Sequence, residues 1–355
     1  MHDLIIVGGG LAGLALAERM ARDGADIVLL EARDRLGGRV LAHQTAAGRY
    51  DLGPAWIWPG MQPRLRALVA QAGLTVYPQD EAGGLVFEDA SGTIQRFARG
   101  FGQEPPSLRI VGGISALIDH LAGRLAADRV RLETPVTGLQ LQHDHVRVIT
   151  ESGALAARRV ALAMPPRLAA ALVFAPPLPP ETDAALRQVP TWMAGQAKAL
   201  VIYRAGFWRE AGLSGAAMSQ IGPLGEIHDA SLPGAGEAAL FGFFAWPPAL
   251  RAARQATLAD AVRSQLGRLF GPAALAPDAI VIRDWADDRW TSTALDQVAL
   301  REHPSYQAMD LPPGWGDRVW LAGSESAADF GGYLEGALAA AANLAGAVSI
   351  NREFS

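Results

Sequence analysis

The stretch "DLIIVGGGLAGLALAERMARDGADIVLLE", residues 3–31, decides the fold. Its apolar run LIIV is typical of a parallel strand covered on both faces, and the following segment has helical spacing that stops at Gly24. Between them, the Gly-x-Gly-x-x-Gly spacing permits a tight turn, close approach of a pyrophosphate to backbone N–H groups, and close packing of the helix on the strand. The stretch therefore predicts a dinucleotide site in which the helix N-terminus favours the phosphate charge. Its cofactor-binding residues would be Gly8, Gly10, Leu11, Ala12 and Gly13.

The second strand of this unit, DIVLLE, ends in an acid. Glu31 follows Gly13 by eighteen residues, where a carboxylate can accept hydrogen bonds from both ribose hydroxyls and disfavours a 2′-phosphate. The spacing is compatible with both NAD and FAD. The structural alternative is a plain tight turn without a nucleotide.

Composition limits the functions that the chain can have. The 355 residues carry a net charge of −5 and no long basic run, which argues against nucleic acid or an anionic membrane as partner and favours a small molecule. The absence of cysteine excludes disulfides, thiolate metal sites and cysteinyl cofactor attachment. The N-terminus resembles no signal peptide, and "GALAAAANLAGAVSI", residues 336–350, is too short and weakly apolar for a membrane helix, so we expect a cytoplasmic protein.

One lysine, Lys198, stands in a chain that otherwise uses arginine for its basic residues. It lies in "AKALVIYR", residues 197–204, which alternates as a strand and places the lysine on one face with Leu200 and Ile202. A lysine stem can cover apolar surface while its tip reaches water, but arginine could fill such a role. The retained lysine therefore indicates an active-site role, in which burial would lower its pKa.

"EARDRLGGRV" and "DLGPAWIWP", which begin at residues 31 and 51, resemble the flavin-containing amine oxidase family of monoamine and polyamine oxidases. The resemblance implies FAD, held noncovalently because the family's attachment position falls at Ala294. It implies that Glu31 and Arg33 meet the adenosine ribose and that Arg39 meets the pyrophosphate, whereas solvated loop arginines are the alternative. The residues beside the flavin ring would be Gly53, Ala55 and Trp56.

"VWLAGSESAADFGGYLEGALAAA", residues 319–341, resembles the family's closing flavin motif. That resemblance implies that Glu325 holds the ribityl and phosphate region and that Leu334 donates its backbone N–H to the ring. Tyr333 would be an aromatic wall of the substrate pocket, with an ordinary core or surface tyrosine as the alternative. The "RIVGGISALIDHLAGRL" segment at 109–125 and the strand after Pro135 also resemble the family, and there the Val136 backbone would meet adenine.

Two further segments concern the reacting centre. "KALVIYRAGFWRE", residues 198–210, resembles the family strand whose lysine points at flavin N5 through a water. Together with Tyr333 of the closing motif, this makes Lys198 and Tyr333 the candidate catalytic residues. In "DWADDRWTSTALDQ", residues 284–297, the family's second cage aromatic is replaced by Leu295, and large apolar side chains could take its place. The tentative pocket residues are Trp290, Leu295 and Trp246, with Trp285 a further possibility.

The resulting fold class is α/β, with a Rossmann-like FAD-binding domain of the glutathione-reductase type and a substrate domain of mixed or antiparallel sheet plus helices. The FAD-binding domain would comprise 1–78, 107–166 and 289–355, and the substrate domain 79–106 and 167–288. His143 and His145 lie at the tip of an expected hairpin, so no metal site is predicted. Family members have a long helical roof where this chain has only 79–106, so a partner subunit could cover the cavity and a homo-oligomer is possible.

The predicted function is FAD-dependent amine oxidation. A hydride equivalent would pass from the amine α-carbon to flavin N5, the imine would be hydrolysed, and O2 would reoxidise the flavin to give H2O2. The alternatives are a flavin dehydrogenase or desaturase acting on a non-amine substrate, and a flavin-bearing interaction module without turnover.

Overall fold

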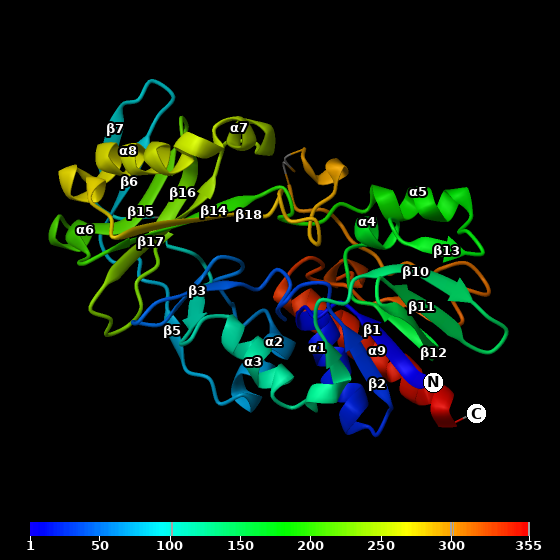
Figure 1. Cartoon of the computed structure of the whole chain (residues 1–355). Coiled ribbons are helices and arrows are strands. Elements are labelled where there is room, and N and C mark those ends of the chain that lie inside the picture. Colours follow the sequence, from blue (N-terminus) through cyan, green and yellow to red (C-terminus); the bar gives the residue numbers. More distant parts are fainter. Residues whose placement is uncertain (101, 299, 301, 354–355) are drawn as a thin grey trace.

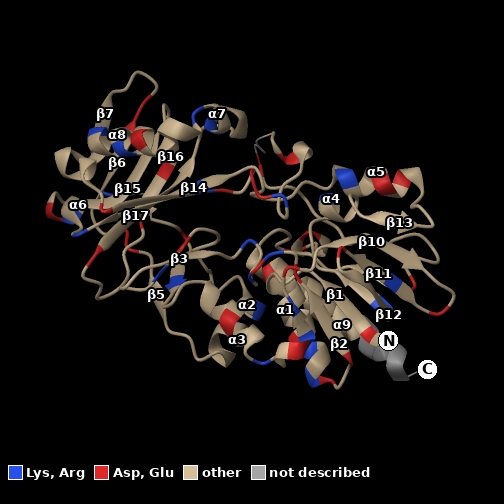
Figure 2. Cartoon of the chain, in the orientation of Figure 1, with Lys and Arg blue, Asp and Glu red and all other residues tan. Residues whose placement is uncertain are grey.

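The computed structural model describes residues 1–353 apart from 101, 299 and 301. It has two lobes, each built on a sheet, which meet along a central region crossed by several segments of the chain (Figure 1). Basic and acidic residues are interspersed along the chain in both lobes (Figure 2). No helix in the described part combines the length and apolar character that a bilayer crossing demands.

The first sheet has the strand order β13-β10-β11-β12-β1-β2-β9, with β19 also paired to β12. Strands β1, β2, β12 and β19 run parallel, so their carboxyl ends share one edge of the sheet. The antiparallel pair β10–β11 is the hairpin that the sequence predicts around His143 and His145. The strand bounds are β1 His2–Val7, β2 Ile27–Leu30, β9 Val130–Arg131, β10 Val136–Leu141, β11 Val146–Thr150, β12 Gly153–Leu162, β13 Val173–Ala175 and β19 Val319–Leu321.

Helices cover both faces of this sheet. On one face, α1, α3 and the alanine-rich α9 pack into a core with the β1 side chains Leu4 and Ile6. On the other face, Ile5 and Val7 pack with Ala169, Phe174 and Leu186 from the segment around α4 and α5. The helices of this lobe are α1 Leu11–Arg22, α2 Pro63–Gln71, α3 Ser115–Ala122, α4 Pro166–Ala169, α5 Pro180–Gln188 and α9 Leu334–Glu353, with short turns η1 Ala127–Arg129, η4 Ala294–Asp296 and η5 Ser324–Ser326.

The second sheet has the order β18-β14-β17-β16-β15-β6-β7 and is mainly antiparallel. Segment 79–106 contributes the last two strands at one side of this sheet, β6 and the edge strand β7. The bounds are β6 Gly84–Glu88, β7 Ile94–Phe97, β14 Ala197–Tyr203, β15 Leu213–Ser219, β16 Leu224–Asp229, β17 Ala238–Phe244, β18 Ala279–Asp284, α6 Phe207–Glu210, α7 Pro248–Ala253, α8 Leu258–Phe270, η2 Gln255–Thr257 and η3 Pro272–Leu275.

Strand β14 is buried along its whole length and separates two cores. Ala199 and Val201 pack toward α8, whereas Leu200 and Ile202 pack toward Tyr50 and its neighbours on the side of the first lobe. The alternation predicted from AKALVIYR is therefore confirmed, and Lys198 lies on the face that looks toward the first lobe. Two short ribbons lie between the lobes: β3 Ala42–Gln44 with β4 Arg49–Asp51, and β5 Val76–Pro78 with β8 Leu108–Ile110.

The predicted change of domain at residue 166 is corrected. Strand β13 pairs with β10 in the first sheet, and Phe174 and Leu186 lie in its core. The double proline at 165–166 begins the short helix α4 instead of a linker, because proline suits the first turn of a helix. After α5, the chain returns to the second sheet only at Ala197.

Candidate active site

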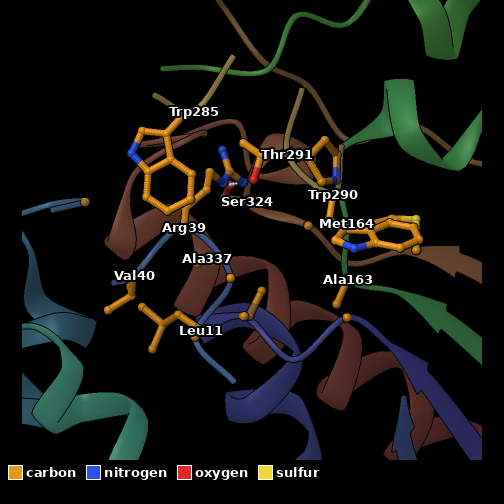
Figure 3. Close-up of a pocket in the computed structure, with 18 of the residues that line it drawn as sticks. Leu11, Arg39, Val40, Ala163, Met164, Trp285, Trp290, Thr291, Ser324 and Ala337 are labelled. Carbon is orange, nitrogen blue, oxygen red and sulfur yellow. Dashed lines mark hydrogen bonds between the residues drawn. The ribbon is translucent and has the colours of Figure 1, made fainter. Parts of the chain in front are cut away.

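A cavity of about 660 Å³ lies where the carboxyl edge of the first sheet faces strand β14. Small-molecule and cofactor sites commonly measure about 300–1,000 Å³. Predicted site residues from both lobes line it: Gly8, Gly10, Leu11, Ala12, Glu31, Arg33, Arg39, Gly53, Ala55, Trp56, Val136, Lys198, Trp290, Tyr333 and Leu334. Figure 3 draws Trp285 and Trp290 on opposite sides of this cavity, with Arg39 and Ser324 between them.

The glycines of the first turn have different tasks. A Cβ on Gly13 would lie 1.9 Å from the Gly8 carbonyl oxygen, and one on Gly8 would lie 2.5 Å from the Ala163 carbonyl oxygen, so both serve close packing of the chain on itself. A Cβ on Gly10 would meet no protein atom nearer than 3.9 Å, and Gly10 lines the cavity. No side chain caps the N-terminus of α1, so its N–H groups are available to an anion.

Glu31 is buried where β2 ends and is fixed by backbone donors. Its Oε2 accepts from the Gly9 N–H at 2.7 Å, and its Oε1 accepts from the Arg33 N–H at 2.9 Å. The Arg33 guanidinium donates to Asp288 Oδ1 at 2.7 Å and to Thr291 Oγ1 at 2.9 Å. Arg33 is therefore no solvated loop residue, and its contacts tie the 288–291 loop to Glu31.

Arg39 is held at the cavity by two residues of the segment that follows β19. It donates to Glu325 Oε1 at 2.6 Å and to Ser324 Oγ at 2.9 Å, and Glu325 is 1% exposed. Glu325 does not line the cavity itself, so in this structure its carboxylate acts on Arg39. A buried carboxylate that fixes a guanidinium in this way presents the remaining donors of the arginine to a ligand in the cavity.

Lys198 enters the cavity from β14 and is 2% exposed. Its Nζ donates to the Gly53 carbonyl oxygen at 3.0 Å and lies 4.1 Å from the centre of the Phe241 ring. Burial lowers the pKa of Lys198 from 10.5 to about 7, with Asp51 raising it and Arg109 lowering it. A lysine in this position can be a neutral amine near neutral pH.

Aromatic side chains form two groups in the wall. Trp56 packs at 6.2 Å from Phe243 and 6.4 Å from Trp58, measured between ring centroids. In the second group, the Tyr333 ring stacks on the His303 ring, with 4.7 Å between the ring centroids and an interplanar angle of 16°, and the Trp192 ring lies 4.8 Å from that of His303. The exposed fraction of Tyr333, 37%, is consistent with a wall residue that meets both cavity and solvent.

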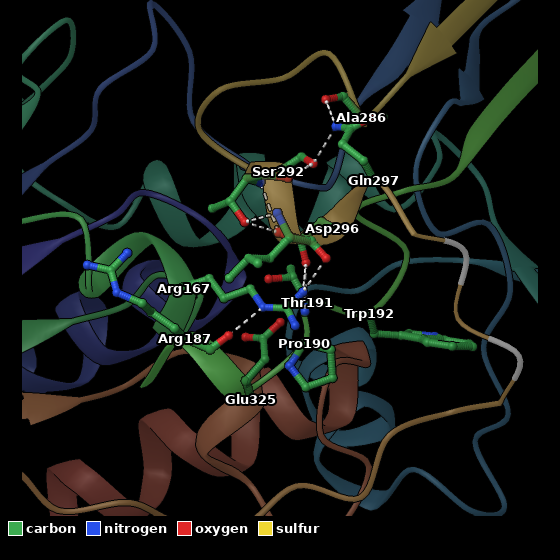
Figure 4. A network of polar contacts seen from close by, with 12 residues as sticks. Arg167, Arg187, Pro190, Thr191, Trp192, Ala286, Ser292, Asp296, Gln297 and Glu325 are labelled. Atoms are coloured by element: carbon green, nitrogen blue, oxygen red, sulfur yellow. Dashed lines mark hydrogen bonds and ion pairs between the residues drawn. The ribbon is translucent and has the colours of Figure 1, made fainter. Parts of the chain in front are cut away.

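Asp296 fixes the segment that carries Trp192, as Figure 4 shows. Its Oδ1 accepts from Arg167 Nη1 at 2.5 Å and from the Thr191 N–H at 3.3 Å. Its Oδ2 accepts from the Thr293 N–H and hydroxyl at 2.9 and 2.8 Å, which closes a tight turn. In this turn, the Leu295 side chain lies outside the cavity and is exposed to solvent.

The predictions for the substrate pocket are corrected at Leu295 and Trp246. Leu295 does not line the cavity and is 52% exposed, because the Asp296 turn directs it outward. Trp246 lies in the second lobe, where it packs against the core beside α8 and Arg254 stacks on it. Trp290 lines the cavity, and its backbone N–H donates to Asp288, the partner of Arg33.

Several residues of this site were missed from the sequence. Trp192 belongs to the aromatic wall, His303 packs against Trp192 and Tyr333, and Asp51 and Arg109 influence the charge of Lys198. Asp51 stood in the quoted "DLGPAWIWP" and Arg109 opened the quoted "RIVGGIS", so a charged residue in each apolar segment was an available signal. Within the described residues, no cluster of acids and histidines suited to a metal ion exists.

Comparisons with known proteins show the family of the chain and proteins with a similar fold. Residues 81–349 match the family described as flavin containing amine oxidoreductases, and residues 6–72 match the NAD(P)-binding Rossmann-like domain. A probable flavin-containing monoamine oxidase A of Dictyostelium discoideum is 23% identical over 95% of each chain. An L-amino acid dehydrogenase of Synechocystis sp. is 23% identical over 95% of this chain and 92% of that protein. The solved structure of a putrescine oxidase bound to putrescine superposes with a TM-score of 0.82 at 20% identity, covering 98% of this chain and 99% of that one.

Proposed function

Because the chain belongs to the family of flavin containing amine oxidoreductases, we propose that it is an FAD-dependent amine oxidase whose reacting centre lies beside Lys198. The observation that carries this proposal is the cavity itself, which joins the glycine turn and Glu31 of one lobe to the buried Lys198 of the other. A single elongated ligand that spans these residues would bring its far end to the lysine.

The cavity residues fit FAD. Gly10 faces open space at the uncapped N-terminus of α1, where a pyrophosphate would be accommodated. Glu31 would meet the adenosine ribose, Arg39 would meet the pyrophosphate, and the Val136 backbone would meet adenine. Gly53, Ala55, Trp56 and the Leu334 N–H at the start of α9 would lie around the ring. A cysteinyl link is excluded because the chain has no cysteine, and Ala294 stands at the family's attachment position, so FAD would be held noncovalently.

Bound FAD would supply the redox chemistry, accepting at N5 a hydride equivalent from the amine α-carbon and passing two electrons to O2 to give H2O2. The chain would bind a neutral amine, keep bulk water from its α-carbon and orient it. Lys198 would stand next to the reacting atoms as a buried amine that can hold or release a proton at Nζ near neutral pH. The imine product would then be hydrolysed by water.

The lining residues also point to a class of amine. Among the described residues that line the cavity, the carboxylates are Glu31, directly after β2, and Glu151, in the turn between β11 and β12, so both belong to the first lobe. The wall beyond consists largely of aromatic and amide side chains: Trp56, Trp58, Gln62, Trp192, Gln196, Phe243 and Tyr333. Such a wall offers no carboxylate to neutralise a second ammonium group, so we propose a monoamine with an apolar remainder as substrate.

An anaerobic amine screen tests the proposal. The flavin-loaded protein is mixed without oxygen with hexylamine, 2-phenylethylamine, putrescine and an L-amino acid, and the loss of flavin absorbance is followed. We expect rapid bleaching by the apolar monoamines, slow bleaching by putrescine, and H2O2 when air is admitted. Bleaching without recovery in air, but with recovery by a quinone or dye, would identify a dehydrogenase. No bleaching by any amine would contradict amine oxidation.

A further inference from the structure

Three buried charged side chains from separate elements gather at the Lys198 end of the cavity. Lys198 comes from β14, Asp51 from the end of β4, and Arg109 from the centre of β8, and they are 2%, 4% and 3% exposed. The carbonyl oxygen that accepts from Lys198 belongs to Gly53, two residues after Asp51. Asp51 and Arg109 do not line the cavity, but both are close enough to Lys198 to interact electrostatically with it.

The carboxylate of Asp51 is held in a fixed place. Its Oδ1 accepts from the Ile114 N–H at 3.0 Å, at the N-terminal end of α3. A Cβ on Gly113 would lie 2.8 Å from the same oxygen, so the glycine lets the backbone approach the carboxylate closely. Burial raises the pKa of Asp51 to about 6, against the opposing effects of Arg109, Lys198 and the Ile114 N–H.

Arg109 carries a positive charge that is poorly compensated. Its Nη1 donates to the Ser231 carbonyl oxygen at a long 3.4 Å, and its guanidinium lies 5.6 Å from the Tyr77 ring. Its Nε is buried without a partner in the structure, as are the hydroxyls of Tyr77 and Ser107. Such a group of buried polar atoms is a place where ordered water is expected. Among the described residues, neither Asp51 nor Arg109 forms an ion pair.

The other charged groups around Lys198 have hydrogen-bonded partners of their own. On β18, Arg283 is the cross-strand neighbour of Lys198 and forms an ion pair with Asp288, which also accepts from Arg33. On β16, His228 packs against Phe241 and forms a hydrogen bond with Glu226 at 2.6 Å. Because Arg283 has a carboxylate next to it, its effect at the lysine is smaller than that of an unpaired charge.

We propose that Asp51 and Arg109 are opposed positioning residues that together set the charge state of Lys198, the carboxylate favouring the ammonium form and the guanidinium the neutral amine. Burial alone would strongly favour the neutral amine. The Asp51 carboxylate stabilises the ammonium form and so opposes the effect of burial, and the Arg109 guanidinium weakens this stabilisation. The lysine therefore changes charge near neutral pH. The effect on turnover rests on the proposed function, whereas the effect on the lysine does not.

The sequence offers a direct test, because Lys198 is the only lysine in the chain. Growth on lysine labelled with ¹³C at Cε gives a single side-chain NMR signal, whose shift against pH reports the ionisation of Lys198 in the oxidised, flavin-loaded protein. The variants are Asp51→Asn, which keeps an oxygen for the Ile114 N–H, and Arg109→Gln. The control is Tyr77→Phe, which removes an unpartnered hydroxyl beside Arg109 without changing charge.

The two charge variants should move the pH midpoint of the Lys198 titration in opposite directions. Loss of the Asp51 carboxylate should lower it and loss of the Arg109 guanidinium should raise it, each by on the order of one pH unit, while Tyr77→Phe leaves it in place. An unchanged midpoint in either charge variant, shifts in the same direction, or an equal shift in Tyr77→Phe would overturn the proposal. If Asp51→Asn does not fold, the upward shift required of Arg109→Gln decides the question alone.

A second arm separates this inference from the proposed function. Anaerobic flavin reduction by an amine is measured against pH in the same variants. If the NMR midpoints move as expected but no amine reduces the flavin, the charge-setting role stands and amine oxidation fails. If amines reduce the flavin but the midpoints do not move, the charge-setting role fails alone.

Discussion

The amino group of Lys198 donates a 3.0 Å hydrogen bond to the backbone carbonyl oxygen of Gly53, which joins the second sheet to the segment after β4. The bond joins two residues that are far apart in the sequence, and it holds the chain's single lysine inside the cavity. Because its pKa falls to about 7, chiefly through burial, this lysine affects both stability and reactivity.

The first prediction concerns pH and stability. Between pH 7 and 10.5 the unfolded chain holds more protons at Lys198 than the folded chain does, so this residue makes the free energy of unfolding rise with pH. The rise is at most about 1.4 kcal/mol per pH unit. Relative to Lys198→Met, the wild type should therefore gain stability from pH 7 to 9 in denaturant titrations. A difference that stays flat with pH would contradict a lowered pKa.

The glycine turn gives a prediction in which two similar changes have different results. Gly13→Ala should lower the free energy of unfolding by about 1–3 kcal/mol or more, because its Cβ would strike the Gly8 carbonyl. Gly10→Ala should change the stability of the flavin-free protein by less than about 1 kcal/mol, yet weaken FAD retention, because its methyl group enters the cavity. Denaturant unfolding and flavin release measure the two effects. Gly60→Ala, in open space, is the control.

The buried acid at the end of β2 gives a third prediction. In Glu31→Gln, an amide NH2 group must face either the Gly9 N–H or the Arg33 N–H, both of which now donate to the carboxylate. We expect FAD to bind roughly 30-fold more weakly, the equivalent of about 2 kcal/mol. Asp34→Asn removes an exposed carboxylate three residues away and should leave the affinity unchanged. Equal affinities of Glu31→Gln and wild type, measured by flavin fluorescence, would remove Glu31 from the cofactor site.

The aromatic wall gives a fourth prediction. Tyr333→Phe keeps the ring that stacks on His303 and should change kcat/KM for an apolar amine by less than about threefold. Tyr333→Ala opens the wall and should lower kcat/KM about tenfold, mainly by raising KM. Steady-state kinetics with 2-phenylethylamine measure this split. Loss of activity in Tyr333→Phe would show that the hydroxyl matters more than the ring.

Features that depend on local sequence pattern could be predicted. The glycine turn, the buried acid Glu31, the β10–β11 hairpin and the alternation around Lys198 all follow from the period and spacing of nearby residues. The partners of the charged residues could not be predicted in the same way. Arg39 meets Glu325, 286 residues later, and Arg33 meets Asp288, 255 residues later, and such pairs form only when segments far apart in the sequence come together.

The substrate end was the least predictable part. Leu295 was placed in the pocket by its position in a motif, but the turn closed by Asp296 directs it to the surface. Trp192 forms part of the wall because Asp296 bonds to the backbone of the preceding residue, a contact between segments that no periodicity reveals. The domain boundary was misplaced for a similar reason, since a double proline can begin a helix as well as a linker.

Rapid kinetics of Lys198→Met test the central claim most directly, namely that Lys198 stands at the reacting end of the bound flavin. Stopped-flow absorbance follows flavin reduction by an amine without oxygen, and then reoxidation of the reduced protein by O2. We predict that the variant keeps its FAD and that at least one of the two half-reactions slows tenfold or more, an effect of about 1.4 kcal/mol or more on the barrier. Wild-type rates in both half-reactions would contradict the account.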